Sequence, residues 1–351
     1  MAILDTTSST RARRQPTTTR LTIPCAGSRL IYRGAPLVMG ILNITPDSFS
    51  DGGALTDPDQ AVARGVQMAA EGADLLDVGG ESTRPGAQRV PVEEELRRVV
   101  PVIRRLATSI RIPISVDTSK AEVAAQAIKA GASLVNDVTA LQGDAKMAEV
   151  VVSTQAAVIL MHMQGSPQTM QKRPRYHNII GDIAAALVIA AERARQAGIA
   201  RSRVLIDPGL GFGKTVAQNL ELLKELRHFV SLGFPVVVGP SRKSFIGATL
   251  DLQVEERLAG SLACAALDAD GLRELLTAAK ARTDRTLNVN FFTHATAKDG
   301  ADHDAARTQG RRPTDDRLGD GFGCRAGEDD LRPLRPCRRG HIGPRRLDKI
   351  A

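Results

Sequence analysis

The segment LVMGILNITPDSFSDGG, residues 37–53, decides the fold class of this chain. It opens with an apolar run, 37–42, that contains one glycine, turns polar at Asn43 and breaks into a loop at Pro46. A strand that is apolar on both faces is typical of a parallel sheet covered by helices. In such folds chemistry gathers at the carboxyl ends of the strands. The polar residues after this strand are therefore candidates for a functional site.

The same strand-then-polar pattern recurs six more times, and Ala-rich segments of helical period separate the strands. Seven β–α units predict a TIM (β/α)₈ barrel, whose usual size is about 250 residues. A doubly wound sheet is the alternative, but it usually has fewer strands and one dominant phosphate loop. The predicted strands are 37–43, 74–79, 112–117, 133–137, 156–162, 203–207 and 235–239, and the predicted helices are 59–71, 93–108, 121–130, 144–154, 180–197 and 217–231.

The segments outside these units differ in character. Residues 21–23 and 29–32 flank Gly27 and predict a short hairpin that plugs the barrel floor. Thr, Ser and Arg dominate the start of the chain, which has no apolar stretch, whereas Asp, Arg, Gly and Pro dominate its end. Such compositions predict disorder. We expect a disordered leader at 1–20, a barrel at 21–295 and a low-order basic tail at 296–351.

The net charge of +8 on 351 residues is not spread over the chain. Residues 21–270 carry 26 Lys and Arg against 26 Asp and Glu, so the basic excess lies at the ends. A neutral body without aromatic interleaving does not predict nucleic-acid binding. No run approaches the roughly 18 apolar residues of a membrane span. The four cysteines lack metal or disulfide spacing, which predicts reduced thiols in the cytoplasm.

Nearly every predicted strand ends in a polar side chain. One strand-end aspartate is often only a helix N-cap. Seven consecutive polar endings are hard to explain as caps, and on a barrel they all point into one mouth. We therefore expect a single site lined by Asn43, Asp77, residues 81–84, Asp117, Asn136, Asp137, His162, Asp207 and residues 241–243.

These endings offer mixed chemistry. Asp117, Asn136 and Asp207 supply hydrogen-bonding groups for the edges of a flat heterocycle. Asn43 supplies an oxygen ligand acceptable to Mg²⁺. Cationic side chains at other strand ends suit an anion such as phosphate or carboxylate: Arg84, Arg242 and Lys243.

The segment DPGLGFGKT, residues 207–215, has some features of a phosphate-binding P-loop. A P-loop needs glycine where this chain has Pro208, so we reject that interpretation. The glycines instead let the backbone approach a flat ligand, with Phe212 packing on it.

Six motifs resemble those of the dihydropteroate synthases, a family of pterin-binding barrels. They occur in the family's order across 36–262, and together they are highly specific. The motifs are NITPDSFSDGG (43–53), DVGGESTRPGA (77–87), ISVDTSKAEVA (114–124), NDV (136–138), LIDPGLGFGKT (205–215) and GPSRKSFIG (239–247).

The resemblance implies a transferase of folate biosynthesis. Members of the family join 6-hydroxymethyl-7,8-dihydropterin pyrophosphate to 4-aminobenzoate, with Mg²⁺, and release pyrophosphate and 7,8-dihydropteroate. Sulfonamides mimic aminobenzoate in this family, and its members are usually homodimers. We expect the same substrates, the same ion and a homodimer here.

The resemblance also assigns roles to residues of this chain. It implies that Asp117, Lys243 and Asn43 are catalytic, and that loops 43–53 and 79–90 close over the reacting bond. The implied pterin contacts are Asp117, Asn136, Asp207 and Lys243, with Met161 and Val138 as the walls of the pterin site. Asn43 is implied to contact Mg²⁺ and pyrophosphate. The implied aminobenzoate contacts are Thr83, Arg84, Phe212, Ser241 and Lys243, and Arg242 is also implied to bind substrate.

The chain departs from the family after residue 263. The family's eighth strand ends in an Arg-x-His-Asp group that binds pyrophosphate, and this group is missing. We expect 287–292 to replace that strand, with His294 near the mouth. Residues 260–295 faintly resemble a segment of nitronate monooxygenases, but so short a segment implies no flavin activity. The alternative function is a catalytically impaired pterin-binding remnant.

Overall fold

The computed structural model describes residues 20–45, 57–84, 86–266 and 289–293. The chain divides into two compact units, residues 1–299 and 300–351, and every described residue belongs to the first. Among these residues no helix is both long and apolar enough to cross a membrane. Of the predicted leader and tail, only Arg20 is described, so those two segments stay predictions.

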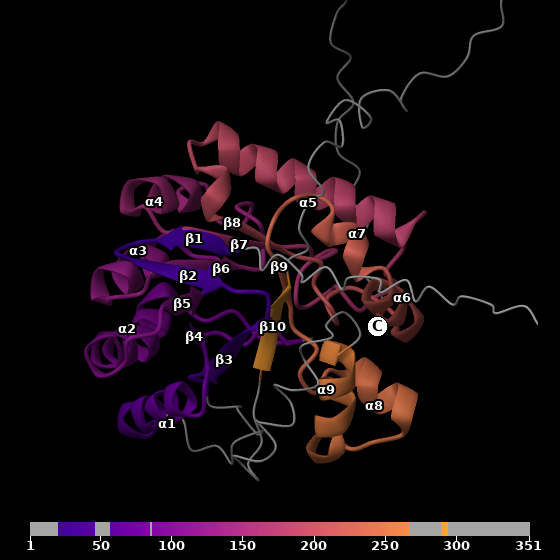
Figure 1. Cartoon of the computed structure of the whole chain (residues 1–351), viewed down its shortest axis with the longest axis horizontal. Helices are drawn as coiled ribbons and strands as arrows, with labels where there is room; N and C mark the ends of the chain where they lie inside the picture. The colour runs from indigo at the N-terminus through magenta and orange to yellow at the C-terminus, as the bar shows by residue number, and fades with distance from the viewer. Residues whose placement is uncertain (1–19, 46–56, 85, 267–288, 294–351) are drawn as a thin grey trace, which may run out of the picture. The chain divides into compact units, whose positions relative to one another are not determined.

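The first unit contains the predicted TIM barrel (Figure 1). Its strands close in the order β10-β3-β4-β5-β6-β7-β8-β9, and β3 to β9 run parallel in sequence order. Their carboxyl ends therefore share one mouth. The strands are β3 (Leu37–Asn43), β4 (Leu75–Gly79), β5 (Ile114–Asp117), β6 (Leu134–Asp137), β7 (Ala157–Met161), β8 (Val204–Asp207), β9 (Val236–Val238) and β10 (Val289–Thr293).

Helices cover the barrel on the outside, and Val, Ile, Leu and Ala side chains fill the layer between the helices and the strands. Local signals set several helix starts. Asp57 caps α1, and Thr215 and Gln218 form a capping box at α6. The helices are α1 (Pro58–Ala70), α2 (Val92–Ser109), α3 (Ala121–Ala130), α4 (Met147–Thr154), α5 (Ile179–Gln196), α6 (Val216–Lys224), α7 (Leu226–Val230), α8 (Ser244–Leu250) and α9 (Leu258–Ala266), with short 3₁₀ turns η3 (Arg201–Arg203) and η4 (Val254–Glu256).

The predicted helix 217–231 is two helices. Glu225 leaves helical geometry, with φ −100° and ψ 22°, and separates α6 from α7. Both pieces still bury apolar residues on the barrel side, among them Leu222 and Phe229. The apolar period alone does not reveal the break, because it continues through both pieces.

The hairpin of β1 (Leu21–Cys25) and β2 (Ser28–Tyr32) lies at the barrel floor, as predicted. The backbone N–H of Ala26 donates to the carbonyl of Ser133, just before β6 begins. Ile23, Cys25 and Leu30 of the hairpin join one apolar cluster with side chains of the strand interiors. The hairpin therefore closes the end of the barrel opposite the mouth.

Strand β10 completes the barrel where the family's eighth strand is missing. It pairs with β3 and with β9, which confirms that the segment near 287–292 enters the barrel. It runs antiparallel to both neighbours: Val289 lies opposite Gly40, and Thr293 lies opposite Val236, the first residue of β9. The strand thus runs from the mouth side toward the floor. The expectation for His294 assumed the opposite direction, and His294 itself lies outside the described residues.

Candidate active site

Residues at the carboxyl ends of four neighbouring strands lie side by side at the mouth. Asn43 pairs with Gly79, Gly79 with Asp117, and Asp117 with Asn136. Gly79 leaves room above the sheet because it has no side chain. A Cβ added there would lie 3.5 Å from Asn43 Oδ1 and 3.7 Å from Asp117 Oδ2. The side-chain oxygens of Asn43 and Asp117 therefore both border the space above this glycine.

Asp77 lies on β4, two residues before Gly79, and is almost fully buried. Asn136 Nδ2 donates a hydrogen bond of 2.9 Å to Asp77 Oδ2. Burial raises the pKa of Asp77, although the bond from Asn136 acts in the opposite direction. This bond fixes the orientation of the Asn136 amide, because Asp77 takes the nitrogen and leaves the carbonyl oxygen for another partner.

Asp117 is the most strongly perturbed carboxyl group of the mouth. Burial raises its pKa well above the usual value, and the charges of Asp77, Glu95, Asp137 and Glu81 raise it further. Its Oδ1 is buried and has no hydrogen-bond partner among the described residues. A buried carboxylate without a partner favours a cationic neighbour strongly, since nothing else compensates its charge.

The opposite side of the mouth carries Asp207, Lys243 and Phe212. Asp207 Oδ1 accepts a 2.6 Å bond from Gly209 N, while burial raises the pKa of Asp207 to about 6. Loss of water lowers the pKa of Lys243 to about 8, although the charges of Asp207 and Asp117 act to raise it. Lys243 Nζ lies 4.0 Å from the centre of the Phe212 ring, a cation–π contact.

Gly211 lets the Lys243 side chain pass. The backbone at Gly211 has φ 81°, and an added Cβ would lie 2.9 Å from Lys243 Cδ. Any other residue at 211 would therefore be strained and would displace the lysine. Arg84, on the loop after β4, is exposed, and its charge lowers the pKa of Lys243. The charges of the two cations therefore act on each other.

Lys214 is a buried cation that points into its own loop. Its Nζ donates to the carbonyls of Gly209 and Phe212, both at 2.8 Å, and to that of His162 at 3.3 Å. Burial lowers its pKa to about 7. The rejected P-loop would have sent this lysine to a phosphate. It instead ties the loop after β8 to the end of β7.

The loop after β9 is held by residues at and just before the start of α9. The N–H of Arg242 donates to Ser261 Oγ at 2.8 Å, and its carbonyl accepts from Arg257 Nη1 at 3.2 Å. Arg242 has φ 52°, a left-handed conformation that is uncommon for a residue with a side chain. These bonds stabilise the turn that presents Ser241, Arg242 and Lys243.

Val138 and Met161, the predicted walls of the pterin site, both line a cavity of about 340 Å³. The cavity continues between the loops after β6 and β7 to Leu187 and Ala190 of α5. It contains both apolar and polar wall atoms, the latter including those of Gln142. The structure therefore leaves space beside the mouth on this side.

The structure brings the predicted residues to one mouth except Asp137, whose carboxylate accepts bonds from Thr139 N and Leu141 N of its own loop. Two parts of the predicted site are incompletely described. Loop 43–53 is described only as far as Thr45, and within loop 79–90 Pro85 is not described. Two buried charges were absent from the predicted site: Glu95 and Lys214. Glu95 lies on α2, and Lys214 looked like part of a phosphate loop.

No group of three or more His, Cys, Asp or Glu side chains is placed to hold a metal ion within the described ranges. Asn43 Oδ1 and Asp117 Oδ2 do both border the space above Gly79. Oxygen atoms are the ligands of Mg²⁺, which usually keeps several waters and takes few protein ligands. The residues therefore fit an Mg²⁺ ion that shares its coordination with water and substrate.

Comparisons with known proteins agree with this site. Residues 39–272 match the family described as pterin binding enzyme. Dihydropteroate synthase of Escherichia coli is 48% identical over 234 residues, covering 67% of this chain and 83% of the relative. The chain therefore belongs to the pterin-binding enzymes, and within them to the dihydropteroate synthases. It is a transferase of folate biosynthesis.

Solved structures show the same fold. Yersinia pestis dihydropteroate synthase, in complex with a sulfonamide drug, has a TM-score of 0.68 and 43% identity, covering 74% of this chain and 98% of that one. The Xanthomonas albilineans enzyme with 4-aminobenzoic acid has a TM-score of 0.67 and 44% identity, covering 76% of this chain and all of that one.

Proposed function

We propose that this chain condenses 6-hydroxymethyl-7,8-dihydropterin pyrophosphate with 4-aminobenzoate to give 7,8-dihydropteroate and pyrophosphate. The observation that carries the proposal is the arrangement of the mouth, where Asp117, whose Oδ1 has no hydrogen-bond partner among the described residues, lies at the same strand ends as Asp207 and Lys243. Both Asp207 and Asp117 act on the pKa of Lys243, so the three groups share one space. The reaction itself is inferred from the family to which the chain belongs.

The pterin ring binds between the two sides of the mouth. Its edge carries both donors and acceptors, which match the carboxyl groups of Asp117 and Asp207 and the free carbonyl oxygen of Asn136. Met161 and Val138 pack against the ring. Because these groups are already held by the strands and by the Asp77 bond, little ordering is needed when the ring binds.

Departure of pyrophosphate leaves positive charge on the pterin methylene carbon. Asp117 stabilises that charge when it is ionised, and the cation in turn favours the ionised form of Asp117. This stabilisation is stronger in the transition state than with neutral substrate bound, which is the condition for catalysis. The aromatic amine of 4-aminobenzoate then attacks the methylene carbon.

The aminobenzoate lies near Lys243. Phe212 offers a ring face, Thr83, Ser241 and Arg84 offer hydrogen bonds, and the cations attract the carboxylate. The Xanthomonas albilineans relative binds 4-aminobenzoic acid and the Yersinia pestis relative binds a sulfonamide drug. We expect sulfonamides to compete with aminobenzoate here, and Arg242 to contact substrate beside Ser241.

Asn43 would hold Mg²⁺, with waters and diphosphate oxygens as its other ligands. The ion would neutralise charge on the leaving pyrophosphate.

The experiment is a turnover assay. Purified full-length protein is incubated with the pterin pyrophosphate, 4-aminobenzoate and Mg²⁺, and release of pyrophosphate and formation of dihydropteroate are both followed. Release that depends on aminobenzoate supports the proposal. Retained pterin binding without release would reject it and favour the impaired pterin-binding remnant. The specific observation behind that second candidate is β10, whose described residues, Val289–Thr293, include no cation to bind pyrophosphate.

We also propose a homodimer and a cytoplasmic location. Leu250, Val254 and Leu258 are exposed apolar side chains on consecutive elements, a patch that a second copy would cover. Light scattering after size exclusion tests the dimer, and Val254→Glu is expected to yield monomers. Cys25 and Cys264 are free thiols, as expected in a reducing compartment.

A further inference from the structure

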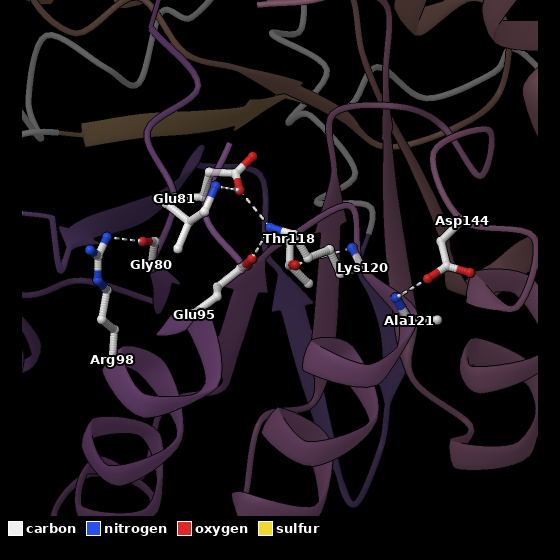
Figure 2. Close-up of polar contacts among 9 residues, drawn as sticks. Gly80, Glu81, Glu95, Arg98, Thr118, Lys120, Ala121 and Asp144 are labelled. Carbon is white, nitrogen blue, oxygen red and sulfur yellow. Dashed lines mark hydrogen bonds and ion pairs between the residues drawn. The ribbon is translucent and has the colours of Figure 1, made fainter. Parts of the chain in front are cut away.

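Three charged side chains from separate segments of the chain meet in one ion-pair group (Figure 2). Glu81 follows β4, Glu95 lies in the first turns of α2, and Lys120 precedes α3. Lys120 Nζ donates to both carboxylates. Glu95 is fully buried, and the other two side chains are 18% exposed. One lysine therefore joins a loop to two helices at a point close to Asp117.

Glu81 closes the base of the loop between β4 and α2. Its Oε2, which contacts Lys120, also accepts a 2.8 Å bond from the backbone N–H of Val90, nine residues further on. One carboxylate oxygen therefore holds both ends of the segment 81–90. Thr83 and Arg84, which we assign to the aminobenzoate, lie inside that segment.

The two ends of this segment have further supports. Arg98 Nη1 donates to the carbonyl of Gly80 at 2.8 Å, as Figure 2 shows. A Cβ on Gly80 would lie 2.8 Å from Val99 Cγ1, so the backbone lies directly on α2. On the other side, Gly86 N donates to the carbonyl of Pro167 at 3.1 Å. Between these supports, the contact of Glu81 with Lys120 joins the loop to the segment that follows β5, the strand that ends in Asp117.

The stability of the fold does not by itself explain why Glu81, Glu95 and Lys120 lie together. Glu95 Oε1 is buried and has no hydrogen-bond partner among the described residues. The charges of Glu95 and Glu81 also raise the pKa of Asp117. A buried ion pair is often no more stabilising than apolar residues of the same volume. What the group does provide is a fixed geometry, because each carboxylate is bound to the same ammonium.

We propose that Lys120 and Glu81 are positioning residues for the second substrate. Lys120 fixes Glu81, Glu81 closes the base of 81–90, and the closed loop places Thr83 and Arg84 at the aminobenzoate end of the mouth. The pterin end rests on strand-borne residues and does not depend on the loop. The inference rests on the proposed reaction, and it predicts that the two substrates respond differently when the loop base is opened.

The test compares Glu81→Ala, Glu81→Gln and Lys120→Met with the wild type. For each full-length protein, kcat, the KM for aminobenzoate, the KM for the pterin pyrophosphate and Tm are measured. Glu81→Ala removes both bonds, and we expect the aminobenzoate KM to rise about tenfold, while the pterin KM stays within about twofold. Glu81→Gln keeps an oxygen for Val90 N, so it is expected to restore most of the aminobenzoate affinity.

The matched control is Glu192→Ala, which removes the partner of Arg195 in an exposed pair of α5, far along the chain from the mouth. It is expected to leave both KM values unchanged. Equal changes of both KM values in Glu81→Ala, or a fall in Tm with no KM change, would overturn the proposal. If Glu81→Ala and Lys120→Met do not fold, Glu81→Asp decides, because its carboxylate is one methylene shorter and cannot reach both Lys120 Nζ and Val90 N. An unchanged ratio of its two KM values overturns the proposal.

Failure of the proposed reaction would look different. A wild type that releases no pyrophosphate rejects the function. The same variants are then compared by calorimetric binding of aminobenzoate in the presence of pterin pyrophosphate. Weaker aminobenzoate binding in Glu81→Ala, with wild-type pterin binding, would still support the positioning role, and equal binding of aminobenzoate would reject it.

Discussion

Burial shifts pKa values in opposite directions on the two sides of the mouth. On the β4–β6 side, Asp77 and Asp117 are buried beside further carboxylates, and the pKa of Asp117 rises well above its usual value. On the β8–β9 side, Lys243 is half-buried, and loss of water lowers its pKa to about 8. Burial disfavours the charged form of an ionisable group, so it raises the pKa of a carboxyl group and lowers that of a lysine. This difference indicates that the β4–β6 side binds a cation and the β8–β9 side binds an anion.

The largest expected effect comes from removing the charge on the acidic side. Asp117→Asn keeps the shape but cannot balance a cation on the pterin methylene, so we expect kcat to fall about 100-fold or more. Steady-state kinetics with saturating substrates measures this fall. An unchanged kcat would mean that the acidic side binds substrate without stabilising the transition state.

On the basic side, Lys243→Ala is expected to abolish measurable pterin binding. The variant removes one of the two cations, Lys243 and Lys214, whose charges lower the pKa of the buried Asp207, and it also removes the contact with the Phe212 ring. A buried carboxylate is destabilised when a compensating charge is lost. Calorimetric titration with the pterin pyrophosphate checks this. Wild-type affinity in the variant would refute the assignment of Lys243.

The pH dependence of kcat/KM separates the two sides within one protein. Activity needs Asp117 ionised, so it rises with pH through a pKa that lies above the usual aspartate range. It also needs Lys243 protonated, so it falls as pH passes about 8. Lys243→Arg retains its charge at high pH, and we expect its alkaline limb to move upward. An alkaline limb at the same pH in both proteins would show that another group controls it.

The smallest expected effect on activity comes from Lys214. Lys214→Met leaves the carbonyls of Gly209 and Phe212 without their donor, at a cost of about 1–3 kcal/mol in the free energy of unfolding. Thermal unfolding is expected to show a Tm lower by several degrees, with a kcat close to wild type. The control is Lys224→Met, an exposed lysine of α6, which is expected to leave Tm almost unchanged. A large loss of kcat would give Lys214 a direct role.

The sequence was sufficient for the parts of the fold that repeat. Each of the seven parallel strands has an apolar run of its own, so the predicted and observed ranges agree closely, as at Leu37–Asn43. The row of polar endings followed, because parallel strands in a barrel have their carboxyl ends together. Asn43, Asp117 and Asn136 were predicted on these grounds, and the strand register brings them into line.

What the sequence could not supply depends on contacts between distant segments. An apolar strand looks the same in either direction, so the pattern at 287–292 could not reveal that β10 runs antiparallel. Glu95 is one of three consecutive glutamates at the start of α2, where acidic residues are common for local reasons. Only the approach of Lys120 distinguishes it. Lys214 sits in a glycine-rich loop whose fold decides where its ammonium group points.

The direction of β10 has a consequence for protein engineering. A designer who wanted to give the mouth an additional positive charge for pyrophosphate would, by analogy with the other strands, modify the residue where the strand ends. In this barrel that residue is Thr293, which lies opposite Val236 near the floor. The end of β10 nearer the mouth is Val289. A grafted arginine therefore belongs at the beginning of this strand, and the family's motif cannot be transplanted in its original order.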